Sequence, residues 1–103
     1  REKDGLAMSS RNLRLSPKGR SIAPVLYRGL REGKRLARSG KDGAGEVLAA
    51  IRRTIARQKE VKAQYLEAVE RESLIPVKRV TPGTMIALAA HLEKVRLIDN
   101  IIV

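Results

Sequence analysis

Hydrophobic residues in the first half of the chain recur at helical spacing. Ile22, Leu26 and Leu30 are four residues apart, which places them on one face of an α-helix. Ser16 is a good N-cap residue, and Pro17 suits the first helical position. The pattern therefore predicts an amphipathic helix that begins at about residue 16.

Two interruptions divide this helical half of the chain. Pro24 lies within the apolar pattern and lacks a backbone N–H, so we expect a kink or a late helix start there. Residues 39–43, with the sequence Ser-Gly-Lys-Asp-Gly, are typical of a helix end followed by a loop. A second helix is predicted over residues 45–59. Its apolar stripe consists of Val47, Leu48, Ile51 and Ile55.

After residue 60 the hydrophobic period changes from helical to nearly two, which is typical of β-strands. Strands are predicted over residues 62–69, 85–90 and 96–102. Residues 73–83 contain two prolines and form an irregular connection, and residues 93–95 are short enough for a hairpin turn. The predicted fold class is α+β, with two helices that cover one face of a small antiparallel sheet of about three strands.

Composition limits the possible functions. The chain has 103 residues, of which 43% are hydrophobic, so it has the size of one domain with its own core. It contains no Cys and a single His, which excludes disulfides, thiolate metal sites, a Cys nucleophile and a histidine-cluster metal site. No apolar run approaches the roughly 20 residues needed to span a bilayer. Because the sequence does not begin with Met, we expect it to be a piece of a longer protein.

The formal net charge of +11 comes from the first part of the chain. Residues 1–59 hold 16 Lys and Arg against 5 Asp and Glu, whereas residues 60–103 hold six of each kind. A concentrated positive field attracts polyanions, so a basic nucleic-acid-binding module is one candidate function. However, only 2% of the residues are aromatic, which leaves single strands little to stack on, and no zinc-finger, helix-turn-helix or RNA-recognition motif is evident. A module that docks an acidic protein is a further candidate, supported by charge alone.

Residues 4–12, with the sequence DGLAMSSRN, combine groups that suit phosphate oxygens. Gly5 frees the backbone to turn. Ser9 and Ser10 place two hydroxyls side by side, and Arg11 adds a permanent planar cation with five donors. These groups suit a bound phosphate, but the same residue types are common in solvated turns. The chemistry of the segment alone leaves both interpretations open.

The same segment closely resembles the start of the C-terminal domain in the pantothenate synthetase (pantoate:beta-alanine ligase) family. The resemblance begins with REKDGLAMSSRN at residues 1–12 and ends with RLIDN at residues 96–100, so it spans almost the whole chain. Three shorter matches lie between them: LSP at residues 15–17, IAPVLY at 22–27 and YLE at 65–67. Since the first and last motifs stand at the correct ends of the chain, the pair is far more specific than either motif alone.

The resemblance implies an ATP-dependent ligase. Members of this family condense pantoate with beta-alanine, using ATP and magnesium, through a pantoyl-adenylate intermediate, and release AMP and pyrophosphate. Their fold is similar to that of class I aminoacyl-tRNA synthetases, in which a Rossmann-like N-terminal domain with a HIGH-type motif precedes a smaller C-terminal lid. Residues 1–103 would form this lid, with residues 1–12 as the hinge and KMSKS-like loop, 16–60 as the helical part and 62–103 as the sheet part. The N-terminal domain is absent from this sequence.

The resemblance assigns ATP contacts to four residues, Met8, Ser9, Ser10 and Arg11. Met8 would lie close to the nucleotide, the two serines would donate hydrogen bonds to phosphate oxygens, and Arg11 would neutralise charge on the departing pyrophosphate. The family's reactive histidines, phosphate-binding Lys and pantoate-binding Gln residues have no counterpart here. The resemblance therefore implies that the isolated chain is inactive and monomeric. It also implies a cytoplasmic enzyme that dimerises through its N-terminal domain and has neither a membrane nor a specific nucleic acid as partner.

The sequence departs from the family pattern at two positions within the resemblance. Arg14 stands where the family usually has an aromatic residue, so the packing near the loop or the local charge is expected to differ. Glu93 stands in the predicted hairpin where the family usually has Gly. Either Glu93 adopts a positive φ, which is strained for a residue with a side chain, or the turn has a different geometry.

Other polar residues are interpreted as structural. His91 has the pattern of a surface or edge position, and Asp99-Asn100 that of a turn or hydrogen-bonded cap at the end of a strand. Tyr65 and Glu67 alternate onto one strand face and are expected to pack against the neighbouring strand. A solvated helix face is expected to carry Arg52, Arg53 and Arg57.

Overall fold

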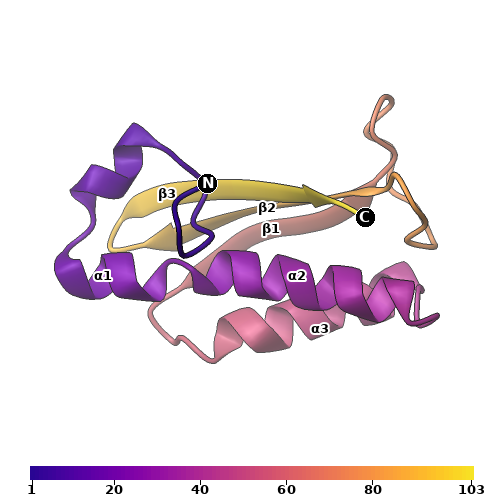
Figure 1. Ribbon diagram of the computed structural model, residues 1–103, viewed down its shortest axis with the longest axis horizontal. Coiled ribbons are helices and arrows are strands. Elements are labelled where there is room, and N and C mark those ends of the chain that lie inside the picture. Colours follow the sequence, from indigo (N-terminus) through magenta and orange to yellow (C-terminus); the bar gives the residue numbers. More distant parts are fainter.

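The computed structural model describes residues 1–103 as α-helices, one short 3-10 helix and β-strands. The helical elements are η1 (Ser10–Arg14), α1 (Pro17–Ile22), α2 (Val25–Arg38) and α3 (Ala44–Ala56). The strands are β1 (Lys62–Val69), β2 (Met85–Leu92) and β3 (Val95–Ile102). Figure 1 shows α2 and α3 side by side beneath one face of the sheet, which confirms the predicted α+β fold.

The signals at the start of the helical half act as predicted. The Ser16 hydroxyl accepts a hydrogen bond from the Gly19 backbone N–H at 3.0 Å, and Pro17 is the first residue of α1. Pro24 separates α1 from α2, as expected for a residue that cannot donate a helical hydrogen bond. The apolar stripe is therefore carried by two consecutive helical segments rather than by one.

The second predicted helix ends earlier in the structure than the sequence pattern indicates. α3 ends at Ala56, three residues before the predicted boundary at residue 59. The Gln58 backbone N–H donates to Ile55, and that of Val61 donates to Gln58. These turns redirect the chain into β1, so the basic residues near position 59 follow the helix instead of extending it.

Two glycines allow α2 to pack closely on α3. A Cβ atom at Gly33 would lie 2.5 Å from Ile51 Cδ1, and one at Gly29 would lie 3.1 Å from Ile55 Cγ1. Both distances are below the roughly 3.5–4.0 Å at which carbon atoms attract each other best. The glycines weaken the helix itself, but they let the fully buried Ile51 side chain lie directly against the backbone of α2.

The strands form an antiparallel sheet in the order β1-β2-β3, with β2 in the centre. β1 has the predicted bounds, whereas β2 and β3 extend towards each other until only Glu93 and Lys94 connect them. Both residues have positive φ angles, 53° and 64°, as in a two-residue type I′ hairpin turn. Of the two geometries considered for Glu93, the strained positive φ is the one found.

The core lies between the sheet and the two long helices. Ile86 and Leu88 from the central strand are buried together with Leu30 of α2 and Ile51 of α3. α2 packs against β3, and α3 packs against β1. None of the helices is long and apolar enough to pass through a membrane. The layering leaves the other face of the sheet, and the outer sides of the helices, open to solvent.

Candidate functional site

The N-terminal segment is attached to the domain by a buried leucine and a tight turn. Leu6 is part of the hydrophobic core. Gly5 has a φ of +95°, and a Cβ atom at this position would overlap the ring of Tyr27 in α2. The turn therefore requires glycine, in agreement with the role predicted for Gly5.

Arg1 fixes the same segment to β3. Its guanidinium makes two hydrogen bonds with the Asp99 carboxylate, at 2.7 and 2.9 Å, and lies 3.8 Å from the centre of the Tyr27 ring. The Asp99 side chain is only 5% exposed, so its charge is almost completely removed from solvent. A bidentate pair of this kind has defined geometry as well as strength. The pair therefore fixes the start of the N-terminal segment against the edge of β3.

The predicted location of Asp99 and Asn100 at a strand end is wrong. β3 continues to residue 102, and Asp99 lies opposite Leu88 of the central strand. Asp-Asn is a frequent turn signal, but here the hydrogen-bond ladder with β2 overrides it. The structural interpretation itself is confirmed, because Asp99 holds Arg1 and the Asn100 backbone oxygen accepts a further hydrogen bond from the same guanidinium.

The residues with predicted ATP contacts lie together on the surface beside β3. Met8, Ser9, Ser10 and Arg11 are all exposed. The Ser9 hydroxyl oxygen accepts a hydrogen bond from the Arg11 backbone N–H at 3.1 Å, which caps η1 and leaves the hydroxyl free to donate. The Arg11 guanidinium forms no ion pair within the chain. The segment Met8–Arg11, called the loop below, therefore presents two hydroxyls and an unpaired cation to solvent.

Asn12 closes the loop from its C-terminal side. Its Nδ2 donates to the carbonyl oxygen of Ala7 at 3.0 Å, which ties together the two residues that flank the loop. Its Oδ1 is buried and has no hydrogen-bond partner in the chain. A buried polar atom left unpaired costs about 1–3 kcal/mol. The sequence motif contains Asn12 but does not indicate this role, because nothing in its spacing shows which carbonyl the side chain reaches.

A pocket of about 340 Å³ lies between the loop and β3. Its lining includes Met8, Ser9 and Arg11 from the loop and Arg96 and Ile98 from β3. Ile98 is 57% exposed and gives the pocket an apolar wall, whereas Arg96 adds a second guanidinium. Sequence reasoning misses Arg96 and Ile98 as site residues, because only the fold brings the end of the chain beside its beginning.

Glu93, one of the two departures from the family pattern, contacts the segment that follows η1. Its carboxylate accepts hydrogen bonds from the Ser16 backbone N–H, at 2.7 Å, and from the Ser16 hydroxyl. These hydrogen bonds hold the pKa of Glu93 below its usual value. A Cβ atom at Gly19 would overlap the carboxylate, so glycine leaves room for it. The other departure, Arg14, is exposed and forms no ion pair.

The other polar candidates in the sheet lie on its surface. His91 is exposed, as predicted, but it belongs to the central strand rather than to an edge. Tyr65 and Glu67 share the exposed face of β1. Tyr65 lies opposite Ala89, which is fully buried although it points to that face, and this agrees with the expected cross-strand packing.

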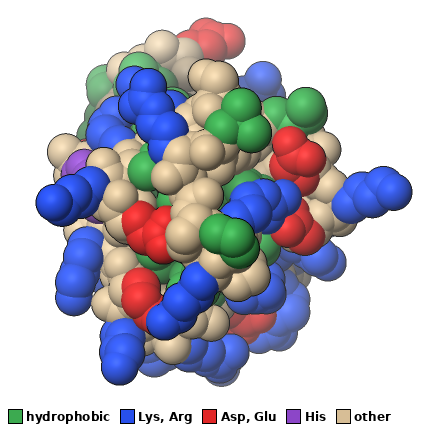
Figure 2. All heavy atoms as spheres, turned by 90° about the vertical axis from the view of Figure 1, so that its left-hand side faces the viewer, with side chains coloured by type: hydrophobic (Ala, Val, Ile, Leu, Met, Phe, Trp, Pro, Cys, Tyr) green, Lys and Arg blue, Asp and Glu red, His purple; other side chains and the backbone are tan.

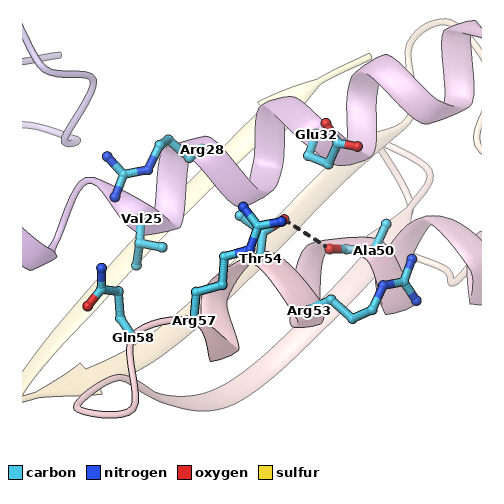
Figure 3. Close-up of a pocket in the computed structure, with 8 residues that line it drawn as sticks. All are labelled: Val25, Arg28, Glu32, Ala50, Arg53, Thr54, Arg57 and Gln58. Atoms are coloured by element: carbon cyan, nitrogen blue, oxygen red, sulfur yellow. Dashed lines mark hydrogen bonds between the residues drawn. The ribbon is translucent and has the colours of Figure 1, made fainter.

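Basic side chains gather on the helical layer. Figure 2 shows Lys and Arg most densely in its lower half, on the side of the helices, in keeping with the excess charge of residues 1–59. Arg52 and Arg53 are exposed on α3, as predicted, and Arg57 is exposed directly after its last residue. Arg53 and Arg57 also line a groove between α2 and α3, together with Arg28 (Figure 3).

The chain contains no group of three or more His, Cys, Asp or Glu side chains that could hold a metal ion. The resemblance implies magnesium for the whole ligase, bound together with ATP, and assigns no ligand of it to this chain.

The fold and the loop define a small α+β domain that presents hydroxyls and a free guanidinium beside the edge of a sheet. A family model described as pantoate-beta-alanine ligase matches residues 1–102. The chain belongs to the pantoate–beta-alanine ligase family, which confirms the resemblance found in its motifs.

Two similar proteins illustrate how much of a family member the chain represents. It is 41% identical over 103 residues to the pantothenate synthetase of Caldicellulosiruptor bescii, with 100% of this chain and 36% of that protein covered. It is 43% identical over 102 residues to a bifunctional pantoate ligase/cytidylate kinase of Synechococcus sp. (strain JA-3-3Ab), with 99% and 19% covered. The chain thus spans only about a fifth to a third of the length of these relatives.

Solved structures of the family contain the same domain. The pantothenate synthetase of Thermus thermophilus superposes with a TM-score of 0.91 at 40% identity, covering 98% of this chain and 36% of that chain. A pantoate-beta-alanine ligase of Francisella tularensis, complexed with beta-gamma ATP and beta-alanine, superposes with a TM-score of 0.57 at 28% identity. That match covers 99% of this chain and 30% of the Francisella chain.

Proposed function

We propose that this chain is the C-terminal domain of a pantothenate synthetase and that its loop closes over ATP. The main support for this proposal is the loop itself. Ser9, Ser10 and Arg11 are exposed beside a pocket, and the guanidinium of Arg11 is unpaired. Membership of the family supports the proposal. The Francisella relative, complexed with beta-gamma ATP and beta-alanine, supports ATP as the ligand.

The whole protein would perform the ligation in two steps. A carboxylate oxygen of pantoate attacks the α-phosphorus of ATP, so that pantoyl adenylate forms and pyrophosphate leaves. The amine of beta-alanine then attacks the acyl carbon, and AMP leaves with the bonding electrons, which gives pantothenate after loss of a proton. Negative charge accumulates on the pyrophosphate in the first step, so groups of the loop act mainly on that step.

Each loop residue has its own part in this step. Arg11 neutralises charge on the departing pyrophosphate, and the hydroxyls of Ser9 and Ser10 donate to phosphate oxygens. Met8, with 70% of its surface exposed, packs against the nucleotide. A preorganised donor aimed at developing charge is worth about 3–4 kcal/mol. The groups that bind pantoate lie outside this chain, so the isolated chain is expected to have no ligase activity.

We assign to the parts of this domain the roles that the family resemblance implies. Residues 1–12 would act as hinge and loop, residues 16–60 as the helical part of the lid, and residues 62–103 as its sheet part. Leu13, which is 89% exposed, would be covered when the lid meets the rest of the enzyme. We propose a cytoplasmic enzyme whose dimer contact lies in the N-terminal domain, and a monomeric isolated chain, with no membrane and no specific nucleic acid as partner.

Pyrophosphate release by the full-length protein that contains this chain tests the role of the loop. Arg11→Ala is expected to lower kcat/KM for ATP by about 100-fold or more, because one charge-stabilising donor is lost. Arg71→Ala is the matched control, since Arg71 is also an exposed and unpaired cation but lies in the connection between β1 and β2. A nearly normal rate for Arg11→Ala would overturn the proposed role.

The division of the active site has a separate test. Purified chain 1–103, supplied with ATP, pantoate and beta-alanine, is expected to form no pantothenate. Production of pantothenate by this chain alone would show that the groups which bind pantoate lie within it, contrary to the proposal.

A further inference from the structure

A groove between α2 and α3 shares no residue with the pocket at the loop. Its volume is about 520 Å³, within the range of small-ligand sites. Figure 3 shows Arg28 and Glu32 on the α2 side and Arg53 and Arg57 on the α3 side, with Arg57 reaching across towards α2. The complete lining consists of Val25, Arg28, Glu32, Ala50, Arg53, Thr54, Arg57 and Gln58.

The charge of this groove is strongly positive and not compensated from within. Arg28, Arg53 and Arg57 are exposed and form no ion pair. Glu32 is the only acidic residue of the lining, and its carboxylate accepts hydrogen bonds from Arg35 at 2.6 and 2.9 Å. The negative charge in the groove is therefore already paired, and the free guanidiniums are left to repel one another.

Of the two neutral donors in the groove, one is already used within the chain and the other is free for a ligand. The Thr54 hydroxyl donates to the Ala50 carbonyl oxygen at 3.2 Å, as Figure 3 shows. The amide of Gln58, which forms no such bond, remains free to donate. The groove thus offers several unsatisfied donors and no free anionic acceptor, an arrangement that favours a ligand with many acceptor oxygens.

A row of arginines on α2 begins at the groove with Arg28 and continues into the hollows beside it. Arg28, Arg31, Arg35 and Arg38 follow at intervals of three and four residues, which places them along one helix face. The row is about 15 Å long at 1.5 Å per residue. These positions are occupied by Arg rather than Lys, and the planar guanidinium matches phosphate oxygens in a bidentate manner. A charged row beside a groove suits an extended anion better than a single compact one.

We propose that the groove between α2 and α3 is a second anion site, which binds a chain of three or more contiguous phosphate groups. Three free guanidiniums line the groove, so each pairs with one phosphate group of the chain. Nucleic acid is a weaker match, because the two aromatic residues of the chain, Tyr27 and Tyr65, both lie outside the groove and offer no stacking surface for bases. The site is independent of the ATP-closing role proposed for the loop.

Titration of chain 1–103 with sodium tripolyphosphate, followed by amide chemical shifts in NMR, tests the site. At an ionic strength of about 0.15 M, saturable shifts are expected around residues 28–32 and 50–58, with a Kd below about 1 mM. The double variant Arg53→Gln/Arg57→Gln is expected to bind at least about tenfold more weakly. Absence of saturable binding in the unsubstituted chain would overturn the proposal.

A matched control separates a site from general charge attraction. Arg71→Gln/Lys78→Gln also removes two exposed cations, but from the connection between β1 and β2. This control is expected to change the Kd by less than about twofold. Equal weakening by the two double variants would overturn the proposal, since binding would then follow net charge alone.

Three further ligands identify the source of the phosphate chain. ATP is expected to cause the same shifts in the groove as tripolyphosphate, even in a variant with Ser9, Ser10 and Arg11 all changed to Ala, whereas adenosine is expected to cause none. Shifts with adenosine as large as those with ATP would contradict recognition of phosphate. Tighter binding of a random DNA duplex, with a steep dependence on salt and the same sensitivity to Arg53→Gln/Arg57→Gln, would overturn the proposal in favour of nucleic acid.

Discussion

The first twelve residues of the chain contain two regions with opposite surroundings. Arg1 forms a bidentate pair with the nearly buried carboxylate of Asp99 and stacks on Tyr27. Ser10 and Arg11 lie a few residues further on, exposed and without a side-chain partner. One continuous sequence motif therefore joins an anchor, whose polar groups are satisfied within the chain, to a loop whose polar groups are left for a ligand.

This difference has an energetic meaning. Polar groups that are paired within the folded chain contribute to its stability. Unpaired exposed groups contribute little to folding and remain available for binding. Changes in the anchor should therefore lower the free energy of unfolding. Changes in the loop should lower the use of ATP while stability stays the same. The comparison fails if the two kinds of change have the same effects.

The largest effect on stability is expected from Asp99→Ala. It removes the partner of Arg1 and leaves a guanidinium beneath the N-terminal turn with its charge unpaired. The Arg1 side chain is 31% exposed, so water offsets part of the loss. We expect a decrease of about 2–3 kcal/mol, less than the 3–5 kcal/mol typical of breaking a fully buried pair. Urea unfolding of chain 1–103 measures the change.

Asn100→Ala is the matched control for this measurement. Asn100 is the exposed neighbour of Asp99 on the same strand, and Arg1 bonds to its backbone oxygen rather than to its side chain. We expect a change of less than about 0.5 kcal/mol, as for most surface substitutions. If both variants unfold at the same urea concentration as the unsubstituted chain, Arg1 and Asp99 do not act as an anchor.

Asn12 lies at the boundary between the two regions and gives the next largest effect. Asn12→Asp keeps the shape of the side chain but replaces the Nδ2 donor with an oxygen, so the bond to the Ala7 carbonyl is lost. Because the new carboxylate oxygen faces the Ala7 carbonyl oxygen, we expect a loss of about 1–3 kcal/mol, seen as a fall in kcat/KM for ATP of about fivefold to 150-fold. Pyrophosphate release by the full-length protein measures it.

The stability of a second variant decides to which region Asn12 belongs. If Asn12 mainly positions the loop, Asn12→Ala, which also removes the buried unpaired Oδ1, should unfold nearly as the unsubstituted chain does. A loss of stability as large as that of Asp99→Ala, with unchanged ATP use, would place Asn12 in the anchor instead.

Local signals account for the parts of the fold that the sequence predicts well. Ser16 and Pro17 carry their capping roles within the first helical turn, and Pro24 breaks the helix through its own missing donor. The strand bounds follow from alternation over a few residues, and β1 matches its prediction at both ends. Each of these signals acts between neighbours, so it can be read without knowledge of the tertiary structure.

The remaining features depend on contacts between distant residues. Arg1 and Asp99 are 98 positions apart, and Ser16 and Glu93 are 77 apart, so neither pair has a signature in the local sequence. The side chain of Asp99 favours a turn, whereas pairing with the central strand decides its conformation. The chemistry of the loop residues suits a phosphate, but only the family resemblance favours ATP contacts over a solvated turn, and the resemblance indicates no role for Asn12.

The smallest effect is expected at Glu93, which joins the hairpin to the segment after the loop. Hydrogen bonds from Ser16 lower the pKa of Glu93 in the folded chain from its ordinary value of 4.5. A group with a lowered folded-state pKa contributes stability above its unfolded pKa, and the contribution is lost as the pH falls. The difference in Tm between the unsubstituted chain and Glu93→Gln should therefore be largest above about pH 5 and should vanish as the pH falls well below about 4.5.

The control for this experiment separates the carboxylate from the backbone. Glu93 has a φ of 53°, which glycine adopts at little cost. Glu93→Gly loses the hydrogen bonds to Ser16 but relieves the turn, so it should be more stable than Glu93→Gln at every pH while also lacking the pH-dependent contribution. The other carboxylates with lowered pKa values, Asp4, Glu32 and Glu70, are common to all three proteins and cancel in the differences. A Tm difference between the unsubstituted chain and Glu93→Gln that stays constant from about pH 7 to about pH 3 would show that the ionised carboxylate of Glu93 adds no stability of its own.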